Sequence, residues 1–244
     1  MYEMSSPDEV LWARPAPGER RPAHTRETIA AAALKLADTR GFDAVTMRNV
    51  ATELGAGTMT LYHYVRNKDE LFALMSEAIM AEIVIPDDEL PDGWREGLAE
   101  IARRTVRVFS KHPWIGDHMD DEQAQAGPSV LRHVEQSLAV AARTGLPVEE
   151  QLEITGLVDD YVFGYAMRNR EQEADRRHLE SMVAYLQTQL VTGEFPHLAE
   201  LMGDDPRAGI ERVMHLASQA ERFERGLRRL LDGIALDVER RGAT

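Results

Sequence analysis

Cysteine is absent from this 244-residue chain, which excludes disulfide bonds and metal sites built on thiolates. No run of about eighteen apolar residues occurs, so the sequence offers no candidate transmembrane helix. Residues 1–21 also lack the charged-then-apolar order of a secretion signal. These absences predict a soluble cytoplasmic protein, and the length suffices for one large or two modest domains.

Basic residues are outnumbered by acidic ones: the chain has 28 Lys and Arg and 42 Asp and Glu, which gives a net charge of −14. The excess of acidic residues is distributed unevenly along the chain. Residues 18–70 hold eight basic and seven acidic residues, a net charge of +1, while residues 1–17 carry −2 and residues 71–244 carry −13. Residues 18–70 are therefore the part that DNA phosphates repel least, although surface acid also keeps a protein soluble.

Strand patterns are lacking as well, since no segment alternates apolar and polar residues with period two. Apolar residues recur instead at helical spacing, and the sequence predicts an all-α protein. Caps and breakers place the helices at 25–41, 46–55, 58–64, 68–85, 94–111, 128–144, 147–170 and 175–192, followed by one or two helices within 205–240.

Residues 46–71 contain two short helical patterns separated by a glycine-bearing turn. The first begins after Thr46, a good N-cap, and ends at Gly55, which supplies a left-handed residue. The second pattern has an outward face of hydroxyls and aromatics that is unusual for a structural helix: Thr58, Met59, Thr60, Tyr62, His63 and Tyr64. Such side chains suit phosphate and base-edge contacts, so this segment predicts a helix-turn-helix whose second helix enters a DNA major groove.

The stretch 60–71, TLYHYVRNKDEL, resembles the DNA-binding domain of the tetracycline repressor (TetR) family, and the resemblance is dense over residues 25–82. It implies that Thr46 and Arg48 lie near the groove edge and the phosphates. It assigns base-edge contacts to Thr58, Met59, Thr60 and His63, and backbone contacts to Tyr62, Tyr64 and Lys68. Gly57 departs from the family pattern, because many relatives have a capping or base-contacting polar side chain there.

Three parts follow from these patterns. Residues 1–24 are rich in Pro, Arg and Glu and are predicted to be a largely disordered arm, whose Arg20 and Arg21 either reach the minor groove or merely add solubility. Residues 25–85 form the helix-turn-helix DNA-binding domain. The acidic, turn-rich joint PDDELPDG begins at residue 86, so residues 86–244 form a helical domain for ligand binding and dimerisation.

Two segments of the C-terminal part are unusually apolar: residues 157–167 are apolar nearly all around the helix, and residues 223–238 have a broad apolar stripe. Such helices must pack against other helices on more than one side. They either fill the core of one chain or pair with a second copy in a four-helix bundle, and the family resemblance implies the second. The predicted dimer residues are Leu157, Phe163, Phe223, Leu227, Leu230, Leu231 and Ile234.

A small-molecule pocket is expected where adaptable apolar bulk meets a few polar tips. Its candidates are Phe109, His112, Trp114, Met119, Tyr161, Tyr165 and Met167. Taken singly, each residue fits a filled core better than a pocket wall, whereas for the set as a whole both interpretations stay open. Residues 112–122 also hold two histidines and four acidic residues, but nothing there fixes a coordination geometry, so no metal is predicted.

The resemblance implies a homodimeric, ligand-responsive regulator, a repressor by family expectation, that binds palindromic double-stranded DNA and is released by a small molecule. No motif in the sequence supports a cofactor or an enzymatic activity, and no apolar run supports a membrane partner. The rival is an all-α small-molecule-binding protein or enzyme with a vestigial helix-turn-helix, in which Arg48→Ala would change stability alone. The sequence leaves the effector, the operator and the regulated genes open.

Overall fold

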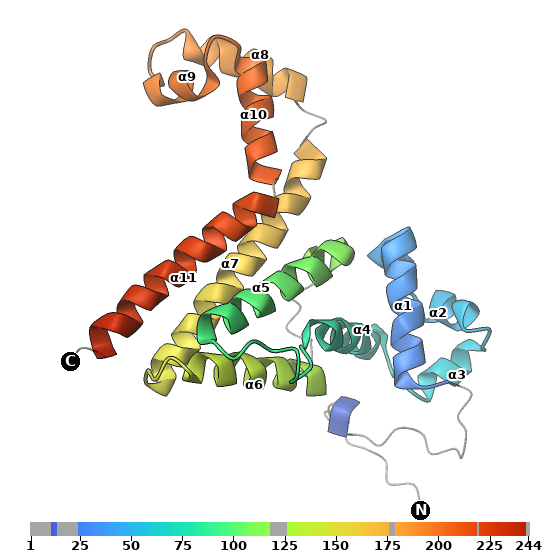
Figure 1. Ribbon diagram of the computed structural model, residues 1–244. Coiled ribbons are helices and arrows are strands. Elements are labelled where there is room, and N and C mark those ends of the chain that lie inside the picture. The colour runs from blue at the N-terminus through green and yellow to red at the C-terminus, as the bar shows by residue number, and fades with distance from the viewer. Residues whose placement is uncertain (1–10, 14–23, 118–125, 176–178, 219, 243–244) are drawn as a thin grey trace, which may run out of the picture. The chain divides into compact units, whose positions relative to one another are not determined.

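The computed structural model describes residues 11–13, 24–117, 126–175, 179–218 and 220–242, and these ranges contain helices but no strand (Figure 1). The predicted all-α class is confirmed. Among the described residues, no helix is long and apolar enough to cross a membrane. The helices are α1 (Arg26–Arg40), α2 (Met47–Glu53), α3 (Thr58–Tyr62), α4 (Lys68–Ile83), α5 (Trp94–Lys111), α6 (Pro128–Ala142), α7 (Val148–Asp175), α8 (Leu179–Leu190), α9 (Pro196–Met202), α10 (Pro206–Ser218) and α11 (Ala220–Gly242), with short 3-10 turns at Leu11–Ala13, Phe42–Ala44 and Pro113–Asp117.

The chain forms two compact units, Met1–Thr155 and Gly156–Thr244. Their division falls within α7, so the first unit contains α5 and α6 together with the helix-turn-helix. The roles assigned to residues 1–24, 25–85 and 86–244 stay predictions. Most of the N-terminal arm, Arg20 and Arg21 included, lies outside the described residues.

Capping residues position the first helices as the sequence predicts. Thr25 caps α1 through a capping box, in which its hydroxyl accepts from Thr28 N at 3.2 Å and the Thr28 hydroxyl accepts from Thr25 N at 2.8 Å. Gly41 follows the helix with φ at 83°, a conformation that costs glycine little. Ile29, Ala33 and Leu36, which recur at helical spacing in the sequence, are buried and form the inner face of α1.

Helix α4 connects the helix-turn-helix to the rest of the first unit, because it packs against α1, α5 and α6. At its C-terminal end, the buried Gln136 side chain exchanges two hydrogen bonds with the Ile85 backbone, at 3.1 and 2.7 Å. In mid-helix, the Glu77 carboxylate accepts from Ser129 N at 2.8 Å, at the start of α6. A tilt of α4 must therefore disturb its contacts with α6.

The second unit contains the C-terminal part of α7, the helix α11 beside it, and a small cluster of α8, α9 and α10 around Val183, Met202 and Ile210 (Figure 1). The sequence predicts no helix between the segments 175–192 and 205–240, and this is wrong: Pro196 opens α9 there, because its fixed φ suits a first turn. Helix α7 also runs on to Asp175, the predicted start of the next helix, since residues 165–192 contain no Gly or Pro.

Candidate functional site

The helix-turn-helix is formed by α2, a turn and α3. The Thr46 hydroxyl caps α2 by accepting from Asn49 N at 3.1 Å, as the sequence predicts. Gly55 turns the chain with φ at 66°, and Ala56 N donates to Ala51 O at 2.9 Å across the turn. Helix α3 then begins after Gly57, which provides no side-chain cap.

The two faces of α3 differ sharply. Leu61 and the following Val65 are completely buried and fix the helix on the core of the domain. On the outer side, Met59 is 74% exposed and Tyr62 is 46% exposed. His63 is also exposed, whereas Thr58, Thr60 and Tyr64 are half-buried. The exposed parts of Met59 and Tyr62 are not covered by the domain, so this face of the five-residue helix is available for a partner.

Arg48 is exposed on α2, the first helix of the motif. Its guanidinium makes no hydrogen bond or ion pair that involves another residue in the described part of the chain. The exposed fork therefore retains five N–H donors for a phosphate or a guanine edge. Arg48 and the outer side chains of α3 together form the candidate reading surface.

The start of α4 is a second candidate contact for phosphate. Asn67 caps the helix by accepting from Glu70 N at 2.8 Å, while the Glu70 carboxylate accepts from Arg66 N at 2.7 Å. Lys68 is exposed in the first turn, and its ammonium lies 4.7 Å from the centroid of the Phe42 ring. The lysine is therefore held near the helix N-terminus, where the dipole favours an anion.

Behind this surface, α1 is joined to the end of α5 through one carboxylate. Asp38 Oδ1 lies 2.8 Å from His112 Nδ1 and accepts a 2.8 Å hydrogen bond from Trp114 Nε1. His112 is 1% exposed, and its Nε2 lies 3.7 Å from Glu82 Oε1 on α4. Trp114 stacks on Phe42 with centroids 5.4 Å apart. We call Asp38, Phe42, His112 and Trp114 the α1–α5 latch.

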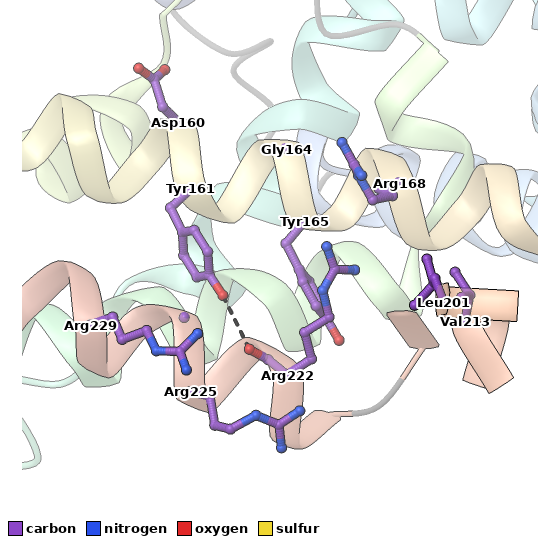
Figure 2. Close-up of a pocket in the computed structure, with 11 residues that line it drawn as sticks. Asp160, Tyr161, Gly164, Tyr165, Arg168, Leu201, Val213, Arg222, Arg225 and Arg229 are labelled. Atoms are coloured by element: carbon purple, nitrogen blue, oxygen red, sulfur yellow. Dashed lines mark hydrogen bonds between the residues drawn. The ribbon is translucent and has the colours of Figure 1, made fainter. Parts of the chain in front are cut away.

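A pocket of about 860 Å³ lies within the second unit, between α7 and α11 with contributions from α9 and α10. Figure 2 shows Tyr161 and Tyr165 extending from α7 toward α11, while the Asp160 carboxylate points to the opposite side of α7. The Tyr161 hydroxyl donates to Phe223 O at 2.9 Å, and burial raises the pKa of this phenol. The lining residues are Asp160, Tyr161, Gly164, Tyr165, Arg168, Leu201, Val213, Arg222, Arg225, Gly226 and Arg229.

The predicted ligand residues are distributed over both units. Tyr161 and Tyr165 line the pocket of the second unit, and Met167 is half-buried on α7 without lining it. Phe109, His112 and Trp114 are buried in the first unit, where the last two belong to the latch. Met119 lies outside the described residues, as does most of the acidic segment considered for a metal. Their role in ligand binding stays a prediction.

The pocket arginines were missed by the sequence reasoning, which followed the apolar stripe of α11. A signal was present, because Arg222, Arg225 and Arg229 are spaced three and four residues apart and so share one helical face. Arg168 joins them from α7, across the pocket.

Burial divides the predicted dimer residues. Phe223, Leu227, Leu231 and Ile234 are at most 5% exposed in the single chain and therefore belong to its own core. Leu230 and Phe163 are half-buried, and Leu157 is 49% exposed. Leu236 on α11, which the sequence reasoning did not select, is 53% exposed.

Comparisons with known proteins agree with this architecture. A family model described as bacterial regulatory proteins of the tetR family matches residues 29–75, and one described as the tetracyclin repressor-like C-terminal domain matches residues 85–238. The chain belongs to the TetR family. Its TetR-family fold is thus established over both the helix-turn-helix and the C-terminal helices, and the resemblance stated from the sequence is confirmed.

Individual relatives have regulatory names. The HTH-type transcriptional repressor DrrR1 of Streptomyces coeruleorubidus is 33% identical, over 96% of this chain and 87% of its own. The class E tetracycline repressor of Escherichia coli is 25% identical, over 89% and 94%. The crystal structure of the TetR-family protein ActR of Streptomyces coelicolor in complex with actinorhodin superposes with a TM-score of 0.70 at 27% identity, covering 87% of this chain and 95% of ActR. This TetR-family protein is therefore a transcriptional regulator.

Proposed function

We propose that this TetR-family regulator is a ligand-responsive repressor that binds a palindromic operator as a homodimer in the cytoplasm. The observation that carries the proposal is the two-faced helix α3, which is anchored by Leu61 and Val65 and exposes Met59 and Tyr62. A small second helix with an unexplained exposed face has the form that enters a major groove. In a dimer, two such helices about 35 Å apart would read successive major grooves.

The side chains divide into two kinds of contact. Thr58, Met59, Thr60 and His63 would meet base edges, with Thr46 and Arg48 at the groove edge. Tyr62, Tyr64 and Lys68 would hold phosphates, and the cation–π contact of Lys68 with Phe42 would position its ammonium for this task. The charge of −14 leaves little non-specific attraction to DNA, so operator recognition would depend on this local surface.

Dimerisation would use apolar side chains that the single chain leaves uncovered. Leu157 on α7 and Leu236 on α11 satisfy this condition, with half of each side chain in solvent. Phe163 and Leu230 would add to the interface. The other predicted dimer residues, Phe223, Leu227, Leu231 and Ile234, would pack in the core of each protomer below it. Leu157→Lys combined with Leu236→Lys should then yield monomers by sedimentation equilibrium, while the helical content remains that of the wild type.

Release would follow from a tilt of α4. This helix contacts α1 on the DNA-binding side and α5 and α6 on the other, so a ligand that prefers another arrangement of the C-terminal helices would move the reading surface. A coupling free energy of about 1–3 kcal/mol between effector and operator would be typical. Actinorhodin, bound by the structural neighbour ActR, provides a first compound to try.

The experiment on DNA binding is fluorescence anisotropy of the full-length protein on tiles of its own upstream DNA, at two salt concentrations. One tile bound at about 1–100 nM by two protomers would support the proposal. Arg48→Ala should then weaken that tile by about 1–3 kcal/mol, whereas Tyr62→Phe should weaken all tiles nearly alike. An unchanged affinity of both variants would instead favour the vestigial helix-turn-helix.

The tilt can be tested with a crosslink, because the chain has no cysteine of its own. Asp87, in the joint after α4, forms an exposed 2.7 Å ion pair with Arg132 on α6. The double variant Asp87→Cys and Arg132→Cys, joined by a short bismaleimide, should still bind operator but resist release by an effector. The same variant left uncrosslinked is the control. Unimpaired release after crosslinking would contradict the tilt.

A further inference from the structure

We infer that Trp12 is a positioning residue for α4: it closes the junction between this helix and the start of α6, and so helps to hold the reading surface in place. The inference rests on the proposed DNA-binding function and gives a task to the N-terminal segment. Ahead of His24, the structure describes Leu11–Ala13, a short turn that lies beside the start of α6 (Figure 1). Leu11 is completely buried and Trp12 is half-buried, so this turn is docked on the folded domain rather than extended into solvent.

The junction on which the turn docks is held by a carboxylate of α4. Helix α6 begins after Gly127, which has no side chain to cap it. The cap comes instead from Glu77, whose two carboxylate oxygens accept from Ser129 N at 2.8 and 3.0 Å. A negative charge at the N-terminus of a helix is also favoured by the helix dipole. Glu77 therefore fixes the middle of α4 to the first turn of α6.

Trp12 lies against this carboxylate cap. A Cβ built on Gly127 would come within 2.8 Å of Trp12 Cε2, and it would overlap the Glu77 carboxylate. The indole and the carboxylate thus lie on the same side of Gly127, with no room for a methyl group beside them. An apolar ring in this place keeps water from the hydrogen bonds between Glu77 and Ser129, and a shielded hydrogen bond opens less often. Trp12 therefore acts on α4 through Glu77.

The consequence for DNA binding follows from the two ends of α4. The helix packs against α1 on the DNA-binding side and has Lys68 in its first turn, whereas Glu77 holds it to α6. If the junction loosens, α4 can take further positions, and only a fraction of the protomers keeps the operator-binding arrangement. The apparent Kd for operator rises by the inverse of that fraction. Loss of the indole should therefore weaken operator binding, although Trp12 lies outside the reading surface.

One added methyl group tests the junction in the full-length protein. Gly127→Ala places this group where the indole and the carboxylate meet, and the extended backbone at Gly127, with φ at −89° and ψ at 178°, suits alanine without strain. Gly93→Ala is the matched control. Gly93 precedes α5 in a similar extended conformation and also without a side-chain cap, but among the described residues its Cβ would meet only the side chain of Glu96 on the same helix.

Two measurements are made on each variant. Hydrogen exchange followed by mass spectrometry should show the Ser129 amide exchanging about tenfold faster in Gly127→Ala and in Trp12→Ala, because its hydrogen bond to Glu77 opens more often. The amides of α1 should keep their wild-type rates, which shows that the domain stays folded. Fluorescence anisotropy should show that the same two variants bind the operator tile about three- to tenfold more weakly. Gly93→Ala should change neither result, and Trp12→Phe, which keeps an aromatic ring, should stay within twofold of the wild type.

A double-mutant cycle separates positioning from simple stabilisation. Trp12→Ala and Glu77→Ala act on one contact, so the double variant should lose no more operator affinity than the more affected single variant. Losses that multiply would overturn the inference. Faster exchange with unchanged operator affinity would overturn it as well, since Trp12 would then contribute to stability alone. If the wild type bound no operator, the proposed function would fail, and wild-type exchange of Ser129 in Gly127→Ala would separately disprove the junction.

Discussion

Replacing Gly226 with alanine would place a methyl group against the phenol of Tyr161, at the floor of the pocket. A Cβ built on Gly226 would overlap the Tyr161 hydroxyl and crowd its ring. That hydroxyl donates to Phe223 O at 2.9 Å, and the tyrosine ring stacks on Phe223. The tyrosine therefore cannot swing aside without loss of both interactions. Gly233, seven residues along the same helix, is exposed and has nothing within 4 Å of its Cβ position.

The magnitudes decide the sign of the effect. Alanine gains about 1 kcal/mol over glycine in a helix interior. At position 226 this gain is opposed by a lost hydrogen bond of about 1 kcal/mol, a disturbed aromatic pair of about 0.5–1.5 kcal/mol, and the cost of shifting a packed ring. Gly226→Ala should thus destabilise the protein by about 1–2 kcal/mol, whereas Gly233→Ala should stabilise it by about 0.5–1 kcal/mol.

Urea unfolding at a fixed protomer concentration, followed by circular dichroism, measures both changes. The fixed concentration matters because the stability of a dimer depends on it. Opposite signs for the two alanines are the expected result. A stabilisation by Gly226→Ala equal to that by Gly233→Ala would show that Tyr161 does not occupy the space beside α11, and would refute this description of the pocket.

Three further predictions concern other parts of the chain. Burial, and then the neighbouring Asp160, raise the pKa of Asp159 from 3.8 to about 6. The folded state therefore holds this proton more tightly than the unfolded state, so stability is lost as pH rises from about 4 to 6, by at most about 3 kcal/mol. Asp159→Asn should stabilise the protein at pH 7.5 and have little effect at pH 4, and a gain of equal size at both pH values in urea unfolding would contradict this. Thr46→Ala removes the α2 cap and should lower the free energy of unfolding by about 0.5–2 kcal/mol in the same assay. An unchanged free energy of unfolding would show that Thr46 does not act as a cap. Asp38→Ala leaves the donors of His112 and Trp114 without their acceptor and should cost about 2–4 kcal/mol; a cost below about 0.5 kcal/mol would show that the latch contributes little.

Local signals predicted the helix-turn-helix region, residues 25–85, well. Thr46 caps its helix as expected, and Thr25 and Asn67 cap theirs in the same way. Such caps can be found in a sequence because the capping side chain accepts a hydrogen bond from a residue only three positions further along. The buried positions of α1 and α3 follow from helical periodicity alone. The exposed face of α3 could likewise be identified from the sequence, since it is what remains after the buried positions are assigned.

Long-range contacts could not be predicted in this way. His112 and Asp38 are separated by 74 residues, and no local pattern indicates that a histidine expected in a ligand pocket instead contacts α1. The burial of Phe223 and Leu227 depends equally on which helix lies beside α11. An apolar stripe shows that a helix face is covered, but the partner that covers it is a property of the tertiary structure.

The position of Phe42 also makes the latch an optical reporter. Its ring receives the Lys68 ammonium at 4.7 Å and stacks on Trp114 at 5.4 Å. Substitution of Trp12 and Trp94 by phenylalanine would leave Trp114 as the only indole in the chain. When a phosphate binds the Lys68 ammonium beside the Phe42 ring, the electrostatic field at that indole changes and its emission should shift. Occupancy of Lys68, the proposed phosphate contact, would then be visible as intrinsic fluorescence, without a dye on the protein or on the DNA.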